Sequence, residues 1–371
     1  MMLPSWKRAV IKVGSNLIAP EGRALSTRYL LGIARFIIDC RGEGRELVLV
    51  SSGAVAAGRA VLGIEPGVRG TVAAKQALAA VGQARMMEAW SRLFDWPCAQ
   101  VLLTADDISN RRRFVNAKNT LRELLALGTL PVVNENDSVA VDELKLGDND
   151  NLAAHVAVLI EADLLIILSD IDGLYDADPR LVPGARLIPE VSAIDASIHA
   201  LAGGTGSTVG TGGMRTKIEA AEKAAKRGIA TLILNGRKAQ ALDAMRRGEN
   251  PGTLFRAQGS ALSAKAHWMK HALESQGVVR VDAGAARALR ERGASLLPPG
   301  VIEVRGSFRA GDAVDVVLEL EGSDRVIAKG VSQYDAIELS RIKGHSSLEI
   351  EGLLGYAGSE VVIHRDDMVM L

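Results

Sequence analysis

The chain has 371 residues and equal numbers of basic and acidic residues, 44 of each, so its formal net charge is zero. This balance disfavours a protein dedicated to binding nucleic acids or membrane surfaces, since both functions call for an excess of positive charge. Hydrophobic residues make up 48% of the chain but aromatic residues only 4%, so the core must be built from Ala, Val, Leu and Ile, as in parallel strands under alanine-rich helices.

Strand-like and helix-like segments alternate through the first 260 residues. Short apolar runs predict strands at residues 9–13, 46–50, 98–103, 130–134, 164–169 and 230–234. Longer amphipathic or alanine-rich runs predict helices at residues 27–41, 71–94, 114–127, 149–160 and 217–227. Ser26 is a plausible cap for the first of these helices. The alternation predicts an α/β fold with an open, mainly parallel sheet sandwiched by helices.

The pattern changes after about residue 260. Residues 265–275 predict a linking helix, and the strands that follow are short and separated by frequent turns. These strands are expected at residues 277–281, 300–304, 313–320, 326–328 and 361–364. We therefore predict three parts: a catalytic domain at residues 1–260, a linker helix at residues 261–276, and a small β-rich domain at residues 277–371.

Three features bear on the compartment. The two cysteines, Cys40 and Cys98, are too few and too isolated for a disulfide framework or a zinc site, so we expect free thiols. Residues 1–9 carry charge and are not followed by an apolar run of signal-peptide length. The most apolar stretch, residues 156–168, is too short and too charged to span a bilayer. A cytoplasmic protein without membrane contact is the simplest prediction.

The most informative segment is a glycine-rich run, Gly210-Thr211-Gly212-Gly213-Met214-Arg215-Thr216-Lys217, directly before a helical stretch. Glycines leave peptide N–H groups uncovered, and the start of a helix adds further unpaired N–H groups and the positive end of its dipole. Lys217 adds a full positive charge, and such a junction attracts a phosphate. The run is neither a Walker A loop nor a dinucleotide fingerprint, and alone it is equally consistent with a turn.

Polar segments also follow the predicted strands, at the edge where an open parallel sheet binds its ligands. They are Lys12-Val13-Gly14-Ser15, Ser51-Ser52-Gly53-Ala54, Asn134-Glu135-Asn136-Asp137 and Ser169-Asp170, and one more segment, Gly147-Asp148-Asn149-Asp150-Asn151, opens a helix. Together with the glycine-rich run that ends at Lys217, they bring two lysines, several exposed N–H groups and few carboxylates to one edge. This combination fits phosphoryl transfer, which depends on positioning and charge neutralisation.

Each of these segments also has an ordinary structural interpretation. Lys12 could be a surface lysine, Ser52-Gly53 a plain turn and Asp137 a solvated turn residue. Asp170 could merely end a strand, and Asp148 or Asp150 could be a helix cap. His155, in an apolar helix, is expected to be a packed histidine and not a base. The joint pattern therefore carries the prediction of phosphoryl transfer.

The segments together resemble the motif set of the glutamate 5-kinases (gamma-glutamyl kinases), within the amino acid kinase superfamily. The resemblance rests on the strand-end and glycine-rich segments quoted above and on Ser169-Asp170-Ile171-Asp172-Gly173-Leu174-Tyr175. The C-terminal part, with residues 287–297 and Gly330-Val331-Ser332, is similar to a PUA domain. The resemblance implies ATP-dependent phosphorylation of the γ-carboxylate of L-glutamate, the first step of proline synthesis. It also implies Mg²⁺ on the ATP phosphates, a homo-oligomer, and gamma-glutamyl phosphate reductase as a partner.

The resemblance also implies roles for individual residues. Lys12 and Lys217 would contact the phosphoryl group in transfer, and Asp150 would hold the two lysines in place. The expected glutamate-binding residues are Ser52, Gly53, Asp137 and Asn149. The expected ATP-binding residues are Lys12, Ser169, Asp170, Thr211, Gly212, Gly213, Met214, Arg215, Thr216 and Lys217, with no separate protein site for a metal. Ser169 stands where many members have Thr, which keeps the hydroxyl group.

Two rival functions are less consistent with the sequence. Acetylglutamate, aspartate or uridylate kinases would share the phosphate machinery, but the appended β-rich domain and the Asn-Glu-Asn-Asp segment disfavour them. RNA binding or RNA modification through the PUA-like domain would call for a basic face. Residues 277–371 instead hold 11 basic and 15 acidic residues, a net charge of −4. Arg287, Arg290 and Arg292 could form a local basic patch, although three arginines on one helix are more often a solvated face.

Overall fold

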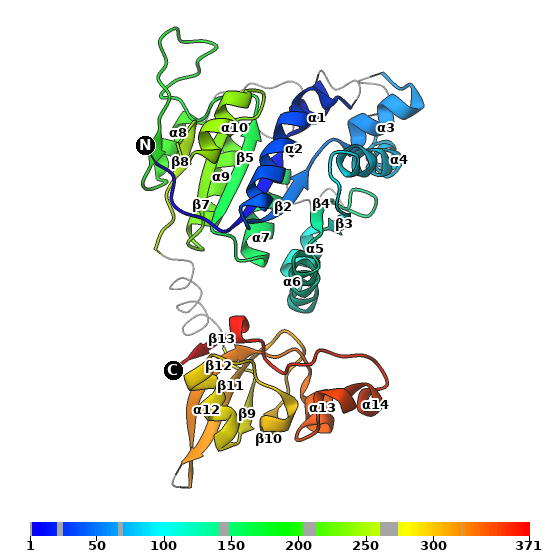
Figure 1. Cartoon of the computed structure of the whole chain (residues 1–371), viewed down its shortest axis with the longest axis vertical. Helices are drawn as coiled ribbons and strands as arrows, with labels where there is room; N and C mark the ends of the chain where they lie inside the picture. The colour runs from blue at the N-terminus through cyan, green and yellow to red at the C-terminus, as the bar shows by residue number, and fades with distance from the viewer. Residues whose placement is uncertain are drawn as a thin grey trace. The chain divides into compact units, whose positions relative to one another are not determined.

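The computed structural model describes residues 2–20, 25–65, 70–140, 148–202, 213–259, 274–320 and 322–371. The chain divides into two compact units, Met1–Ile108 with Ala117–Ala261, and Ser109–Asn116 with Leu262–Leu371. Each unit has its own sheet, and Figure 1 labels the elements of both. Within the described ranges, no helix is both long enough and apolar enough to cross a membrane.

The first unit is built on an eight-stranded sheet with the strand order β3-β4-β2-β1-β5-β7-β8-β6. Its strands are β1 (Arg8–Val13), β2 (Glu46–Ser51), β3 (Cys98–Leu103), β4 (Leu130–Glu135), β5 (Leu164–Ser169), β6 (Glu190–Val191), β7 (Ala230–Asn235) and β8 (Thr253–Phe255). The neighbouring strands in the series β3-β4-β2-β1-β5-β7 pair in parallel, whereas β8 is antiparallel to β7. The open, mainly parallel sheet predicted from the alternation is confirmed, and the short β6 and β8 were not predicted.

Helices cover both faces of this sheet (Figure 1). Those described are α1 (Ser15–Ile18), α2 (Thr27–Gly42), α3 (Ala54–Leu62), α4 (Val72–Ser91), α5 (Ala105–Ser109), α6 (Arg111–Ala126), α7 (Asn149–Leu159), α8 (Ala196–Leu201), α9 (Met214–Ala225) and α10 (Ala239–Arg246). The end of α5 and the start of α6, within Ser109–Asn116, are grouped with the second unit. The predicted cap is confirmed, because the Ser26 hydroxyl accepts a hydrogen bond from the Arg28 amide at 3.2 Å. Both cysteines are free thiols, as expected.

The two faces of β1 lead to different parts of the unit. Ala9, Ile11 and Val13 pack into a core that α2 and α10 complete. Successive side chains of a strand point to opposite faces, so Lys12 faces the other way, toward α7 and α9. All of β1 after Arg8 is buried, which explains its almost continuous apolar sequence. A charged side chain on this strand is therefore buried by the fold itself.

The start of α9 corrects the prediction. The helix begins at Met214, three residues before the expected start, and Gly213 is its N-cap. Met, Arg and Lys are good helix formers, so nothing in this stretch delays the helix after the last glycine. Lys217 consequently lies within the first turn, on the buried side of the helix, and not in the loop ahead of it.

The second unit contains a five-stranded sheet with the order β10-β9-β11-β12-β13. Its elements are β9 (Gly277–Val281), α12 (Ala283–Arg292), β10 (Val301–Gly306), β11 (Ala313–Leu320), β12 (Ser323–Val331), α13 (Ala336–Ile342), α14 (Ile350–Leu354) and β13 (Met368–Met370). Short 3-10 helices lie at Pro298–Gly300, Ser347–Glu349 and Arg365–Asp367. These elements enclose a separate core that includes Val279, Val316 and Tyr334.

Two predictions for this part of the chain need comment. The strand expected at residues 361–364 is wrong: Ile363 makes only an isolated bridge with Leu296. The His364 side chain instead caps a 3-10 helix by accepting from the Asp366 amide, and this turn ends the extended segment before β13. Most of the linker helix predicted at residues 265–275 lies outside the described residues, which resume at Glu274.

Helices α3 and α4 pack closely against each other through glycines. A Cβ added to Gly58 would lie 1.9 Å from the Leu78 carbonyl oxygen, and one added to Gly82 would lie 1.8 Å from the Ala54 carbonyl oxygen. Neither contact involves a flexible side chain that could move away, so both positions require glycine. The crossing fixes the start of α3, directly after the Ser52-Gly53 turn that follows β2.

We therefore expect Gly82→Ala to lower the free energy of unfolding by about 3 kcal/mol, because the new methyl group overlaps a backbone carbonyl. Gly42→Ala is the matched control, since a Cβ at the end of α2 meets nothing within 4 Å. Chemical denaturation of the two variants provides the measurement. Equal stability of Gly82→Ala and the parent protein would show that the helices can separate at no cost.

Candidate active site

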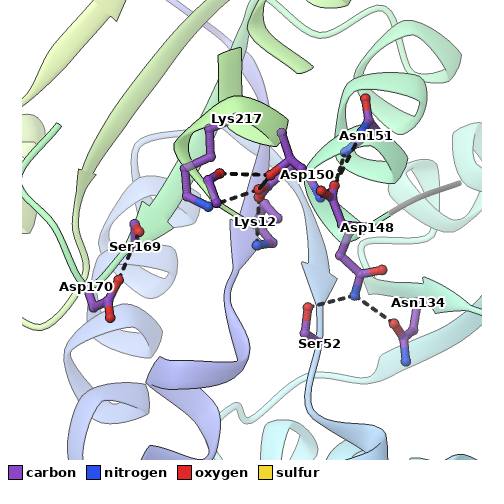
Figure 2. Close-up of polar contacts among 12 residues, drawn as sticks. Lys12, Ser52, Asn134, Asp148, Asp150, Asn151, Ser169, Asp170 and Lys217 are labelled. Carbon is purple, nitrogen blue, oxygen red and sulfur yellow. Dashed lines mark hydrogen bonds and ion pairs between the residues drawn. The ribbon is translucent and has the colours of Figure 1, made fainter. Parts of the chain in front are cut away.

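Three charged side chains meet at the centre of the first unit. Lys12 Nζ lies 2.6 Å from Asp150 Oδ1, and Lys217 Nζ lies 3.0 Å from Asp150 Oδ2 (Figure 2). All three residues are almost fully enclosed, with 6%, 5% and 0% of Lys12, Lys217 and Asp150 exposed. The two ammonium groups that the sequence placed at one edge of the sheet thus share a single carboxylate.

Secondary structure positions each member of this triad. Lys12 is the penultimate residue of β1, and Asp150 and Lys217 lie in the first turns of α7 and α9. Asp148 is the N-cap of α7, and its Oδ1 accepts from the amides of Asp150 and Asn151 at 2.8 and 2.9 Å. The prediction that one of the two aspartates caps the helix is therefore confirmed, and the cap is Asp148. The Asp150 side chain pairs with the two lysines instead.

The triad has a pronounced electrostatic asymmetry. Burial alone would raise the pKa of Asp150, but the positive charges of Lys12 and Lys217 outweigh burial and hold it well below its usual range. The carboxylate is thus ionised, and the three groups together carry a net charge of +1. Buried charges are costly unless paired, and a centre with two lysines around one shared carboxylate is suited to a bound anion.

The start of α9 adds a polar contact and leaves other residues apart. The Thr216 hydroxyl lies 3.0 Å from Asp150 Oδ2, so a third side chain approaches this carboxylate. Arg215, by contrast, is exposed and pairs with Glu219 at 2.9 Å on the surface of the helix. Gly213 and Met214 form the N-cap and the first helical position. Thr211 and Gly212 lie outside the described residues.

A chain of amide hydrogen bonds runs away from the triad. Asn149 Nδ2 donates to Ser52 Oγ at 2.8 Å and to Asn134 Oδ1 at 2.9 Å (Figure 2). Asn134 Nδ2 in turn donates to Gln83 Oε1 at 3.0 Å. Both N–H groups of Asn149 are used in this way, and Ser52 Oγ is an acceptor. The Ser52 hydroxyl proton therefore remains available for another acceptor.

Gly53 forms the turn between Ser52, which belongs to the chain of amide hydrogen bonds, and α3. It has φ of +106°, the left-handed region, and it is the N-cap of α3. An added Cβ would also lie 3.0 Å from Ile18 Cγ2, so both conformation and space favour glycine. The start of α3 directly after Ser52 thus depends on a glycine at position 53.

A pocket of about 270 Å³ lies beside the amide chain. It is lined by α4, β3 and the segment after β4, through Ala79, Ala80, Gln83, Ala84, Gln100, Leu102, Glu135, Asn136, Asp137 and Ser138. Asp137, an expected glutamate-binding residue, is partly buried and lines this pocket, which is partly open.

Ser169 and Asp170 lie on the other side of β1. They end β5, and in the strand order β2-β1-β5 the strand carrying Lys12 separates them from Ser52. Ser169 Oγ is 3.3 Å from Asp170 Oδ1, and Asn16 Nδ2 donates to Asp170 Oδ2 at 3.1 Å. Figure 2 likewise draws the two lysines between the Ser169–Asp170 pair and Ser52. The site therefore has two halves on either side of the triad.

His155 in α7 does not have the properties of a general base at neutral pH. Burial, followed by the charges of Lys223 and Arg227, lowers the pKa of His155 to about 4, so this histidine is neutral at pH 7. Among the residues that the structure describes, no group of three or more His, Cys, Asp or Glu side chains could hold a metal ion.

Sequence patterns alone do not reveal the contact of Gln83 with Asn134 or that of Thr216 with Asp150. Gln83 lies in an alanine-rich helix with no motif around it, and only the fold brings it to Asn134. The indication that the sequence does offer is a polar residue on a face of the helix that otherwise carries apolar residues such as Leu78, Ala79 and Met86. All of these residues are buried.

Two family models and several curated sequences are similar to this chain. A model of the amino acid kinase family matches residues 7–235, and a PUA domain model matches residues 277–354. Glutamate 5-kinase from Salinibacter ruber is 57% identical over 99% of this chain and 98% of its own length. Glutamate 5-kinase from Idiomarina loihiensis is 55% identical over 100% and 99%, respectively. A solved UMP kinase from Bacillus anthracis is 13% identical and covers 69% of this chain and 98% of its own, with a TM-score of 0.49.

The triad predicts a pH-dependent stability difference. Asp150→Asn leaves two buried cations without a counter-charge and should lower the free energy of unfolding at pH 7 by about 3–5 kcal/mol. Because the pKa of Asp150 is lowered on folding, its contribution is complete above the unfolded-state pKa of about 3.9 and is lost as the pH falls further. Denaturation from pH 7 to pH 3 should show the gap between parent and variant narrowing below about pH 4.

Asp170→Asn is the control for this measurement, because Asp170 is exposed and should give only a small difference at every pH. A gap for Asp150→Asn that stays constant across the whole range would contradict the assignment of an ionised Asp150.

Proposed function

The chain belongs to the amino acid kinase family, with a C-terminal PUA domain, and on this premise we propose that it is a glutamate 5-kinase. Its reaction is the transfer of the γ-phosphoryl group of ATP to the γ-carboxylate of L-glutamate, the first step of proline biosynthesis. The observation that carries the proposal is the buried triad of Lys12, Asp150 and Lys217, which gathers two ammonium groups around one carboxylate at the tips of a parallel sheet.

The charge of the triad fits the needs of this reaction. The attacking carboxylate and the leaving ADP are both anions, so the transition state gathers negative charge on the oxygens of the phosphoryl group. Lys12 and Lys217 would stabilise this charge from fixed positions in a site with little water, where electrostatic stabilisation is strong. Asp150 would hold both ammonium groups and would keep their mutual repulsion from separating them.

No general base is needed, since a glutamate side chain is already ionised at neutral pH. This chemistry is consistent with the neutral His155 and with the absence of any activated thiol among the described residues. The bond that forms joins a carboxylate oxygen to phosphorus, and the bond that breaks joins phosphorus to the oxygen of ADP.

The glutamate would occupy the half of the site that holds the amide chain. The Ser52 hydroxyl proton, which no bond from Asn149 occupies, would donate to the substrate carboxylate. The carboxylate of Asp137, in the neighbouring pocket, would pair with the substrate ammonium group. The Gly53 backbone would add an N–H donor at the start of α3.

The nucleotide would occupy the other half. Ser169 and Asp170 lie at the end of β5, and residues 211–217 include the start of α9, whose helix dipole and free N–H groups attract phosphate. Lys12 and Lys217 already engage Asp150, so this carboxylate is not offered to a metal. Mg²⁺ would therefore be held by ATP phosphate oxygens, which suit this ion, and would supply charge neutralisation there.

Further expectations follow from the same assignment. We propose a cytoplasmic location, where both substrates are found, and a homo-oligomer. The acyl phosphate product is reactive in water, so a gamma-glutamyl phosphate reductase is a chemically sensible partner. An RNA-directed role for the PUA domain is the alternative, but its net charge of −4 disfavours it, and binding of RNA at moderate salt would be the observation in its favour.

The activity itself has a direct test. The protein should consume ATP only with glutamate and Mg²⁺, and hydroxylamine should trap the acyl phosphate as a hydroxamate. Lys12→Ala and Lys217→Ala should each lower kcat by about a hundredfold or more, because each removes a charge from the transition state. Lys226→Ala is a matched control on the C-cap of α9, where Lys226 pairs with Glu222 at 2.6 Å on the surface. Near-normal rates for Lys12→Ala or Lys217→Ala would remove that lysine from the mechanism.

We also propose that residues 1–260 form the catalytic domain, residues 261–276 the linker and residues 277–371 the PUA-like domain. The sheet core of the first unit and the core of the second contain no residue in common. A chain that ends at residue 260 should therefore fold cooperatively and keep hydroxamate formation. Circular dichroism and the hydroxamate assay on this fragment provide the measurement, and an unfolded fragment would refute an independent catalytic domain.

A further inference from the structure

Gln83 is a buried amide with half of its hydrogen-bonding capacity unused. Only 8% of the residue is exposed, and its Oε1 accepts from Asn134 Nδ2 at 3.0 Å. Its Nε2 is buried and has no hydrogen-bond partner among the described residues. A buried N–H group without an acceptor is costly, and such groups in folded proteins usually mark a bound ligand or water.

The orientation of this amide follows from the bonds around it. In the structure Asn149 donates to Asn134 Oδ1, Asn134 presents its Nδ2 to Gln83, and Gln83 accepts through its oxygen. The Gln83 NH₂ group is therefore directed away from the amide chain. Gln83 and Asp137 line the same pocket of about 270 Å³, which is large enough for the main-chain end of an amino acid.

We propose that Gln83 Nε2 donates a hydrogen bond to the α-carboxylate of the amino acid substrate and makes Gln83 a specificity-determining residue. This inference rests on the proposed function. The ammonium and carboxylate groups of an amino acid are bonded to one carbon, so the residues that bind them must lie side by side. Asp137 suits the ammonium group and would repel the carboxylate, which therefore needs a neutral donor on the same pocket wall.

The proposal predicts discrimination against 4-aminobutyrate. This compound keeps the reacting carboxylate and the ammonium group of glutamate and lacks only the α-carboxylate. A site built to hydrogen-bond one substrate group rejects the analogue that lacks it, because the buried donor is then left unpaired. The parent protein should thus bind L-glutamate much more tightly than 4-aminobutyrate, and Gln83 should account for part of the difference.

The experiment compares the two ligands in the full-length protein with a non-hydrolysable ATP analogue present, using calorimetric titration. Gln83→Met keeps the volume of the side chain and should weaken L-glutamate binding about tenfold or more, with 4-aminobutyrate changed less than about twofold. Its kcat at saturating glutamate should change far less than its KM. Gln83→Glu retains an acceptor for Asn134 and replaces only the free donor, so it should also lose the preference for L-glutamate.

Gln100→Met is the control, since Gln100 lines the same pocket from β3 but is exposed. It should leave the ratio of the two affinities unchanged. The inference would be overturned if the Gln83 variants lost affinity for both ligands equally while the parent formed glutamyl hydroxamate. Such a result would show that Gln83 only shapes the pocket. Absence of hydroxamate from the parent protein would instead refute the proposed function.

Discussion

Asp150 is the point on which two ammonium groups from distant parts of the chain converge. Its two oxygens lie 2.6 Å from Lys12 Nζ and 3.0 Å from Lys217 Nζ, and the residue has no exposed surface. None of the three side chains could be buried alone without a large loss of hydration. The ends of β1, α7 and α9 are therefore held together by the same charges that make the site attractive to an anion.

The sheet topology places different residues on the two sides of the triad of Lys12, Asp150 and Lys217. Strand β1 carries Lys12 and lies between β2, which leads to Ser52, and β5, which ends at Ser169. An acceptor and a donor bound on opposite sides of β1 would meet at the lysines. Such an arrangement needs little movement of charge during the reaction, because the positive groups are already fixed where negative charge develops.

The helix pair α3 and α4 links the packing of the fold to the amide chain. Gly82 lies against the backbone of α3, and Gln83 is the next residue along α4. The same crossing fixes the start of α3, where Gly53 turns the chain after Ser52. Ser52 and Gln83 are thus the two ends of one hydrogen-bonded chain, and a backbone contact that tolerates no side chain sets the separation of α3, which begins just after Ser52, from α4, which carries Gln83.

The sequence by itself determined the parallel sheet, the boundaries of its six longest strands to within one residue and the residues near the strand tips, because burial on both faces of a strand requires apolar runs such as residues 164–169. It did not indicate short helices such as α3 and α10. It also placed Lys12, Asp150 and Lys217 at the site, although only through motifs. Tertiary structure decided the rest: which aspartate caps α7 and which pairs with the lysines, and that Gln83 reaches Asn134 across 51 positions. These outcomes depend on side chains that are remote in sequence, and a local pattern carries no information about such contacts.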